Sequence, residues 1–441
     1  MPKALLIKGG RIIDPSRDID ITGSLLVREG KIAWLGDGAP PDTDYDVLDA
    51  AGLIVCPGFI DLHCHLRQPG DEEKETIATG TLAAARGGFT TVCCMPNTRP
   101  PLDSEAMISY VKAVAAREGT VRVLPIGCVT LGRKGEELAD MSELETAGAV
   151  AYSDDGAPVG NPDIMRRALE YSRDFNRPVI DHCENVFLTR GGQINEGVVS
   201  LELGLCGMPA SAEELIVQQD LALAAETGGH VHIAHVSTAG SVELIRAAKE
   251  RGVRVTAEVT PHHLTLTEEA VLVSRTGAKV NPPLRTKRDT LALLRALNDG
   301  VIDIVATDHA PHTAADKQGE FTQAAFGISG LETALGSLAG LVLRSELSLN
   351  TLIAALTVGP ARVLGYEKLG TLETGAPADI CIFDLHKEWV VDAEKFASKG
   401  KNTPLDGRTL KGKVMATFYL GEPVYMDETM KIETRENKSD V

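Results

Sequence analysis

The sequence lacks the features of a membrane-spanning, exported or nucleic-acid-binding protein. Its 441 residues carry a formal net charge of −18, which argues against a nucleic-acid backbone or an anionic membrane as the main partner. Residues 1–10 lack the apolar core of a signal peptide, and no segment approaches the ~18 apolar residues of a membrane span. We expect a cytoplasmic protein whose partner is a small molecule, with no nucleic acid and no membrane.

Cysteine is sparse, and it never has the C-x-x-C spacing of a zinc finger. Most of the eight cysteines lie inside apolar runs, as expected of reduced core residues in a cytosolic protein. A zinc finger is therefore not expected. The cysteines are Cys56, Cys64, Cys93, Cys94, Cys128, Cys183, Cys206 and Cys381.

Two histidines, His63 and His65, end an apolar run that begins near Leu53. Alternate side chains of a β-strand point the same way, so both imidazoles can bind one metal ion. The alternative is a pair of strand histidines bonded to backbone. We favour metal binding, because a buried parallel strand has little use for three polar residues, His63, His65 and Arg67, on one face.

Apolar strand-like runs alternate with amphipathic helical stretches through the middle of the chain. Eight such runs predict a (β/α)8 TIM-like barrel over residues 56–365. An open doubly wound sheet is the alternative, but no G-x-G-x-x-G follows an early strand. The expected strands are 58–65, 89–95, 121–128, 149–153, 178–183, 230–236, 253–259 and 302–307, and expected helices include 80–86, 164–173, 212–227, 241–251 and 290–297.

Short β-like runs between glycines occur near both ends of the chain, in residues 1–55 and 366–425. Neither piece alone has enough strands to bury a face, so we expect one small β domain built from both termini. The charged residues 426–441 are expected to form a polar, solvated tail.

Polar residues crowd the carboxyl ends of the predicted barrel strands, where such barrels place their active sites. Imidazoles and carboxylates suit Zn2+, and a bridging carboxylate allows two ions to share a hydroxide, so a pair of divalent metals is expected. Position favours His235 over His230 and His232. It leaves Asp154 and Asp155 equal as the bridging carboxylate.

Six sequence motifs together resemble the amidohydrolase superfamily and, within it, the bacterial dihydroorotases that fuse no other enzyme. They are PGFIDLHCHLR (57–67), MPNTRP (95–100), SDDG (153–156), AHVST (234–238), NPPLR (281–285) and TDHAPH (307–312). The resemblance implies two zinc ions per chain, one bound by His63, His65 and Asp308, the other by His182 and His235, with Asp155 bridging.

The same resemblance implies a reaction and a substrate site. The reaction is the reversible cyclisation of N-carbamoyl-L-aspartate to L-dihydroorotate and water in pyrimidine biosynthesis. Asp308 is the expected proton carrier. Arg67, Asn97 and His312 are expected to bind the substrate carboxylate, and Asn281, Phe326 and Gly327 to hold the ring. The stretch 312–327 is expected to be either a mobile lid or an ordered surface loop.

Two other functions are weighed. Hydantoinases, dihydropyrimidinases and allantoinases typically bridge their metals with a carboxylated lysine after strand four, but no lysine occurs between Lys134 and Lys249. A non-catalytic scaffold that assembles with aspartate transcarbamoylase would have lost metal ligands, and all six are present. Association of an active enzyme with aspartate transcarbamoylase, and a homo-oligomer, are left open by the sequence.

Overall fold

The structure is a computed structural model that describes residues 4–41 and 44–434. Eight short parallel strands form two hydrogen-bonded runs, one of three strands and one of five. Parallel bridges from Gly127 to Tyr152 and from Cys64 to His309 join the runs at both edges, which closes the ring. The predicted barrel is confirmed. Its strands are β6 (Phe59–Cys64), β7 (Phe89–Cys94), β8 (Arg122–Pro125), β9 (Tyr152–Ser153), β10 (Val179–Asp181), β13 (Val231–Ile233), β14 (Val255–Val259) and β15 (Ile304–Val305).

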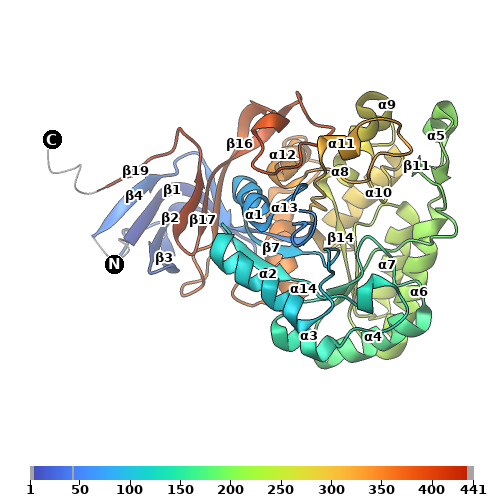
Figure 1. Cartoon of the computed structure of the whole chain (residues 1–441). Coiled ribbons are helices and arrows are strands. Elements are labelled where there is room, and N and C mark those ends of the chain that lie inside the picture. Colours follow the sequence, from blue (N-terminus) through green and yellow to red (C-terminus); the bar gives the residue numbers. More distant parts are fainter. Residues whose placement is uncertain (1–3, 42–43, 435–441) are drawn as a thin grey trace.

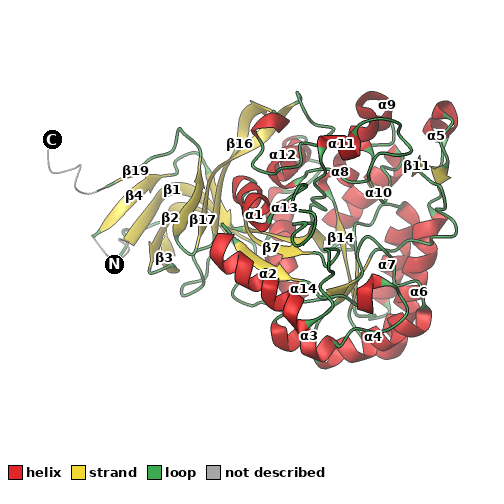
Figure 2. Ribbon diagram, viewed as in Figure 1, coloured by secondary structure: helices red, strands yellow, loops and turns green. Residues whose placement is uncertain are grey.

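Helices cover the outside of the barrel (Figure 2). Side-chain caps define several of their starts: Thr76 accepts from Thr79 N at the first, and Thr286 accepts from Asp289 N at another. The five expected helices are present, and others come in addition. The helices on the outside are α1 (Ile77–Arg86), α2 (Glu105–Glu118), α3 (Met141–Ala147), α4 (Pro162–Asp174), α6 (Ser211–Thr227), α7 (Ala239–Glu250), α10 (Lys287–Asn298), α12 (Ala334–Leu343), α13 (Leu349–Leu356) and α14 (Val358–Leu364).

Shorter elements lie in the connections that follow several barrel strands. They are β11 (Ile194–Asn195), α5 (Val198–Leu203), β12 (Gly207–Met208), α8 (Pro261–Thr265), α9 (Ala270–Ser274) and α11 (Ala314–Lys317). Among the helices that the structure describes, none is long and apolar enough to cross a bilayer.

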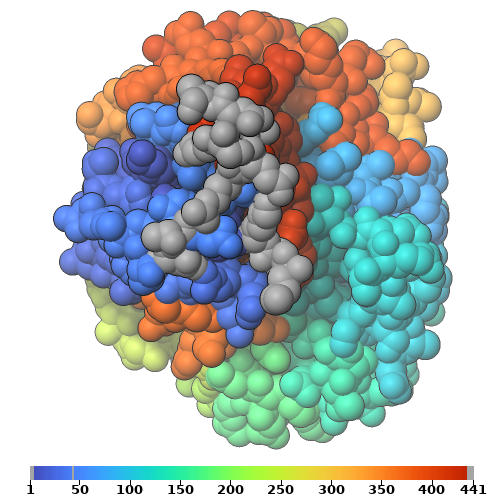
Figure 3. Space-filling view, turned by 90° about the vertical axis from the view of Figure 1, so that its left-hand side faces the viewer, coloured from blue at the N-terminus to red at the C-terminus, as the bar shows by residue number. Residues whose placement is uncertain are grey.

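A nine-stranded sheet from both ends of the chain packs beside the barrel (Figure 1). Its main path is β18-β17-β16-β5-β1-β2-β3, with β4 paired to both β1 and β19. Figure 3 shows N-terminal and C-terminal segments sharing one face. The small β domain from both termini is confirmed. Its strands are β1 (Ala4–Asp14), β2 (Ile19–Arg28), β3 (Lys31–Gly36), β4 (Tyr45–Asp49), β5 (Ile54–Pro57), β16 (Ile380–Val390), β17 (Thr409–Tyr419), β18 (Glu422–Met426) and β19 (Ile432–Glu433).

The C-terminal end of the chain differs in detail from the expectation. Part of the stretch expected as a polar tail is paired in the sheet, because Ile432 and Glu433 pair with Leu48 and Val47. Residues 435–441 lie outside the described residues. The boundaries at residues 55, 365 and 425 stay predictions.

The sheet and the barrel are joined tightly where β5 leads into β6. Gly58 stands between them, and a Cβ at this position would lie 2.2 Å from Oγ1 of Thr90. Only glycine allows such a close approach. The start of β6, the strand that leads to His63 and His65, therefore lies close against its neighbour β7.

Candidate metal centre and active site

Asp155 lies among four histidines that come from three different barrel strands. Its Oδ1 is 3.3 Å from Nε2 of His63, 3.7 Å from Nε2 of His235 and 3.8 Å from Nδ1 of His182. Its Oδ2 is 3.5 Å from Nε2 of His65. All five side chains are buried. One carboxylate can therefore reach ligands on both sides of the cluster, as a bridging group must.

The cluster divides into two neighbouring ligand groups. Oδ1 of Asp308 lies 3.1 Å from Nε2 of His65 and 3.6 Å from Nε2 of His63. On the other side, Nδ1 of His182 lies 3.0 Å from Nε2 of His235. The six residues that the sequence singled out as ligands thus come together, three in the first group, two in the second and Asp155 between them.

The neighbouring acidic and histidine residues are engaged elsewhere. Asp154 accepts hydrogen bonds from the backbone of Val129 and Thr130 and from the Thr130 hydroxyl. His230 bonds to Oγ1 of Thr256 at 2.8 Å. Asp155 and His235 thus lie in the cluster, whereas Asp154 and His230 bond outside it. Position along the strand alone could not distinguish the two aspartates.

Two atoms in the cluster have no hydrogen-bond partner among the described residues. They are Nε2 of His63 and Oδ1 of Asp155, both fully buried. A buried polar atom without a partner is costly, and these two face each other. Imidazole nitrogen and carboxylate oxygen are ligands of divalent zinc, so the residues fit a metal centre.

A second layer of residues fixes the rings of the histidines. Nδ1 of His65 lies 2.9 Å from Oδ1 of Asn97, and Nε2 of His182 lies 2.8 Å from Oε2 of Glu184. Such contacts orient a metal-binding ring and leave its other nitrogen free for the ion. Glu258 does the same for His63 at 2.6 Å. Sequence reasoning assigned a role to neither glutamate, although Glu184 is two residues after His182 and Glu258 is the last residue but one of an expected strand.

Charges within the cluster keep its carboxylates ionised. Burial acts to raise the pKa of Asp155, but the charge of His63 and the close approach of His235 and His63 outweigh burial and hold the pKa well below its usual range. Burial also acts to raise the pKa of Asp308. The contacts with His65 and His63 outweigh burial, so the pKa is lowered. Two anionic carboxylates at the centre of the cluster favour a bound cation.

A hollow of about 220 Å3 opens over the cluster. Eleven of the twelve expected site residues line it, and His63 is the exception, because it is fully buried. Arg67 and His312 lie side by side in the lining of the hollow, with Nη2 of Arg67 3.4 Å from Nε2 of His312. The lining residues are His65, Arg67, Asn97, Asp155, Gly156, His182, His235, Asn281, Asp308, Ala310, His312, Phe326 and Gly327.

Three of the non-glycine residues at the site have backbone angles in the left-handed region. The φ values are 59° for Arg67, 30° for His235 and 45° for Asp308. Non-glycine residues adopt such angles at a cost and keep them only where the surrounding structure enforces them. The local backbone is therefore shaped to aim these side chains into the hollow.

The expected lid segment is held by two buried lysines. Nζ of Lys317 donates to the carbonyl oxygens of Ala325 (2.8 Å) and Gly327 (2.9 Å). Nζ of Lys279 donates to those of Phe321 and Ala324, each at 2.7 Å. Burial lowers the pKa of Lys317 to about 7 and that of Lys279 to about 8. The segment has defined anchors, and its motion stays a prediction.

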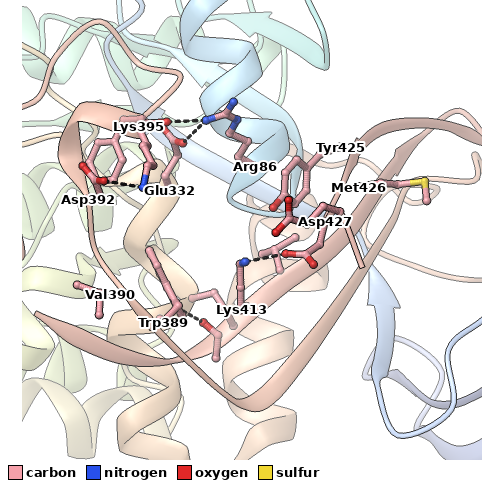
Figure 4. Close-up of a pocket in the computed structure, with 16 residues that line it drawn as sticks. Arg86, Glu332, Trp389, Val390, Asp392, Lys395, Lys413, Tyr425, Met426 and Asp427 are labelled. Carbon is pink, nitrogen blue, oxygen red and sulfur yellow. Dashed lines mark hydrogen bonds and ion pairs between the residues drawn. The ribbon is translucent and has the colours of Figure 1, made fainter. Parts of the chain in front are cut away.

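A larger cavity, of about 610 Å3, lies away from the cluster, between the terminal sheet and the barrel (Figure 4). Most of its charged side chains are paired with one another: Lys413 with Asp427 at 2.6 Å and Lys395 with Asp392 at 2.9 Å. The volume of a cavity alone is therefore a poor guide to the candidate site in this protein. Perturbed titratable groups converge in the smaller hollow, which makes it the candidate active site.

Comparison with known proteins agrees with this geometry. Residues 52–241 match the family model described as "Dihydro-orotase-like". A dihydroorotase of Pelotomaculum thermopropionicum is 54% identical over 97% of this chain and 100% of its own length. A dihydroorotase of Geotalea daltonii is 51% identical over 96% of this chain and 99% of its own.

Solved structures named hydantoinase or dihydropyrimidinase have the same fold. The L-hydantoinase of Arthrobacter aurescens is similar with a TM-score of 0.87 and 26% identity, covering 97% of both chains. The dihydropyrimidinase of Brevibacillus agri is similar with a TM-score of 0.84 and 23% identity, covering 98% of this chain and 97% of its own. Identity to the dihydroorotases is about twice as high and extends along nearly the whole chain, so the chain belongs to the dihydroorotase family.

Proposed function

We propose that this chain is a zinc-dependent dihydroorotase, which interconverts N-carbamoyl-L-aspartate and L-dihydroorotate in de novo pyrimidine biosynthesis. The observation that carries the substrate assignment is the position of Arg67, whose guanidinium lines the hollow over the metal cluster. A guanidinium matches a carboxylate in shape and charge. Relatives of about 50% identity named dihydroorotase support the reaction.

In this proposal His63, His65 and Asp308 hold one zinc ion, His182 and His235 hold the other, and Asp155 bridges them. When bound, the ions supply Lewis-acid chemistry that activates water near neutral pH and polarises the ring carbonyl. Glu258, Asn97 and Glu184 keep the histidine rings in the orientation that binding needs.

Asp308 is the proton carrier of the proposed reaction. Its lowered pKa leaves it ionised, so it can accept the proton of the attacking water and then deliver it to the departing ring nitrogen. In the direction of ring closure the same carboxyl starts protonated, by microscopic reversibility. Asp308 contacts His65 and lines the hollow, so it reaches both the cluster and a bound ring.

The remaining assignments concern recognition. Arg67, Asn97 and His312 are proposed to bind the substrate carboxylate, and Asn281 and the Phe326-Gly327 backbone to hold the ring. Burial and the charge of Arg67 lower the pKa of His312 to about 3, so its ring stays neutral near Arg67. Association with aspartate transcarbamoylase, self-association and a cytoplasmic location stay predictions.

The decisive experiment compares L-dihydroorotate, hydantoin, dihydrouracil and allantoin on one sample of known metal content. We expect kcat/KM to be highest for dihydroorotate, because only this ring of the four carries a carboxylate that Arg67 could bind. Higher kcat/KM for hydantoin or dihydrouracil would favour the cyclic-amidase alternative, which the similarity to a solved L-hydantoinase makes the relevant competitor.

A further inference from the structure

A short stretch of the terminal sheet's chain reaches under the proposed substrate site. It belongs to the connection between β16 and β17, which leaves the sheet and runs beside α12 (Figure 1). Residues 398–402 of this connection are called here the support segment. None of the residues of the support segment is a proposed metal ligand or substrate-binding residue.

The side chain of Asn402 hydrogen-bonds to two segments that line the hollow, residues 310–312 and residues 326–329, which are called here the two arms. Its Nδ2 donates to the carbonyl oxygens of Ala310 (3.2 Å) and Gly327 (3.0 Å), and its Oδ1 accepts from the backbone N–H of His312 (2.9 Å). Asn402 is only 9% exposed. Both amide hydrogens face carbonyls and the amide oxygen faces an N–H, so the opposite orientation of the amide would break all three bonds.

The support segment also packs directly against the turn after Asp308. A Cβ on Gly400 would lie 2.4 Å from Cβ of Pro311 and 2.7 Å from its Cα, so only glycine fits there. Ser329 joins the contact from the other arm. Its N–H donates to the carbonyl of Asn402 at 2.7 Å, and its hydroxyl donates to the carbonyl of Gly400 at 2.8 Å.

The support segment also connects, through Glu75, to His309, which directly follows the proposed proton carrier Asp308. The hydroxyl of Ser398 donates to Oε2 of Glu75, and the same oxygen lies 3.3 Å from Nε2 of His309. Nδ1 of His309 accepts from the N–H of Gly330 at 3.1 Å. All of these side chains are buried. The segment thus contacts the chain on both sides of the hollow through buried hydrogen bonds.

We propose that Asn402 is a positioning residue for substrate recognition, which sets the spacing between His312 and the Phe326-Gly327 backbone. The two arms also bond directly, through Ala310 N to the Ile328 carbonyl at 2.8 Å and through His312 Nε2 to the Phe326 carbonyl at 2.8 Å. Those contacts hold the arms together. Asn402 adds three bonds that fix where His312 and Gly327 stand relative to each other. The inference rests on the proposed function, which assigns these residues to the carboxylate and the ring.

The terminal sheet acquires a role in this way. A residue far along the chain, in the β16–β17 connection, determines how well a ring with a carboxylate fits. Substitution of Asn402 should therefore weaken binding more than it slows the chemical steps, because its side chain bonds to Ala310, His312, Gly327 and Ser329, none of which is a proposed metal ligand.

The test uses the metal-loaded full chain with Asn402→Ala and Asn402→Asp. Asn402→Asp keeps the shape and the acceptor for His312, but places an oxygen against two carbonyls. The matched control is Asn298→Ala. Asn298 also donates its amide to two carbonyls, those of Leu294 (3.1 Å) and Glu346 (2.9 Å), at the end of α10.

We expect KM for dihydroorotate, and Kd for the ring carboxylate orotate measured by calorimetry, to rise about tenfold in both Asn402 variants. The value of kcat should stay within about threefold, and metal content should not change. Asn298→Ala should match the wild type in all of these. Unchanged KM and Kd would overturn the proposal, and so would a joint loss of kcat, metal and thermal stability, which indicates a general folding defect.

A separate measurement keeps this inference distinct from the proposed function. If the wild-type protein binds metal but does not turn over dihydroorotate, the proposed function fails. Hydrogen exchange of residues 309–329 without ligand then decides the positioning role. Exchange should be faster in Asn402→Ala than in the wild type and unchanged in Asn298→Ala. Equal exchange in all three proteins would refute the role of Asn402.

Discussion

Oε1 of Glu258 lies 2.6 Å from Nδ1 of His63, while the other oxygen of Glu258 lies 3.2 Å from Nε2 of His232. Burial would raise the pKa of Glu258, but the charge of His63 and hydrogen bonds with His232 and His63 lower it to about 2. An ionised carboxylate therefore stands behind a proposed zinc ligand. It fixes which nitrogen of His63 faces Asp155.

Glu258→Gln should weaken metal binding by roughly 10–100-fold, because the amide cannot replace the charge that orients and polarises His63. Competition with a chelator measures this affinity. Glu268→Gln is the control, since Glu268 is also buried but bonds to Asn195 outside the cluster. Equal affinities in all three proteins would show that the Glu258 carboxylate does not support the metal.

His182→Ala should remove about one of two metal ions, because His182 and His235 form the ligand pair on one side of Asp155. Elemental analysis of protein purified without chelator gives the count, and circular dichroism checks the fold. His386→Ala, at an exposed position of the terminal sheet, should keep both ions. A wild-type protein with one ion or fewer after zinc reconstitution would contradict the binuclear centre.

Arg67→Met should lower kcat/KM for dihydroorotate by roughly 10–100-fold, since a charge-assisted pair with the carboxylate is lost. Any activity on dihydrouracil should change much less, because that ring has no carboxylate. Arg99→Met is the control, as the side chain of Arg99 is 75% exposed and pairs with Asp71. Equal losses on both substrates would mean that Arg67 supports the structure of the site instead.

Asp308→Asn should abolish both directions of the reaction, because an amide cannot carry the proton. Hydrolysis needs an ionised Asp308 and a deprotonated attacking water, so its rate should rise with pH to a plateau. Condensation starts from the protonated carboxyl and should rise as pH falls. Initial rates in both directions, with metal content measured alongside, test this. A variant that holds two ions and keeps more than about a tenth of the activity would exclude Asp308 as proton carrier.

His230 should make the stability of the protein depend on pH. Burial, together with the charges of His232 and Arg254, lowers its pKa to about 3, against about 6.5 for an ordinary histidine. Between these values the unfolded chain binds one proton more than the folded chain. Stability from the neutral ring is therefore complete above about pH 6.5 and is lost as pH falls.

Urea unfolding from pH 4.5 to 6.5 measures this contribution. The difference in unfolding free energy between the wild type and His230→Gln should shrink by about 1.4 kcal/mol for each pH unit of acidification. His386→Gln should show no such trend, because His386 is exposed. Parallel curves for wild type and His230→Gln would mean that the ring is not held neutral.

Much of the fold was predictable because its signals are local. The apolar runs that became the eight barrel strands are short and separated by amphipathic helices, and the His63-x-His65 spacing marks the first proposed metal-binding strand. The helix α2 was not among those expected. Its buried face is small, with Ile108, Val111 and Val114 as its buried residues, so the amphipathic pattern is weak.

The parts of the site that were not predicted depend on contacts between distant segments. Glu258 and His63 are 195 residues apart, and Asn402 and His312 are 90 apart. A glutamate at a strand end or an asparagine in a connection has many ordinary uses. Only the assembled structure shows which partner each one meets.

The bridge from Cys64 to His309 that closes the barrel has a consequence for how the protein is made. His65 and Asp308 meet across 243 residues of chain, and Asp14 meets Leu372 across 358. During synthesis the ribosome must have delivered most of the polypeptide before either contact can form. Until then the nascent chain holds an incomplete set of the proposed metal ligands, and the edge of β5 that pairs with β16 stays unpaired. If the proposed metal centre holds, metal bound with full affinity would therefore report that translation had passed the last barrel strand.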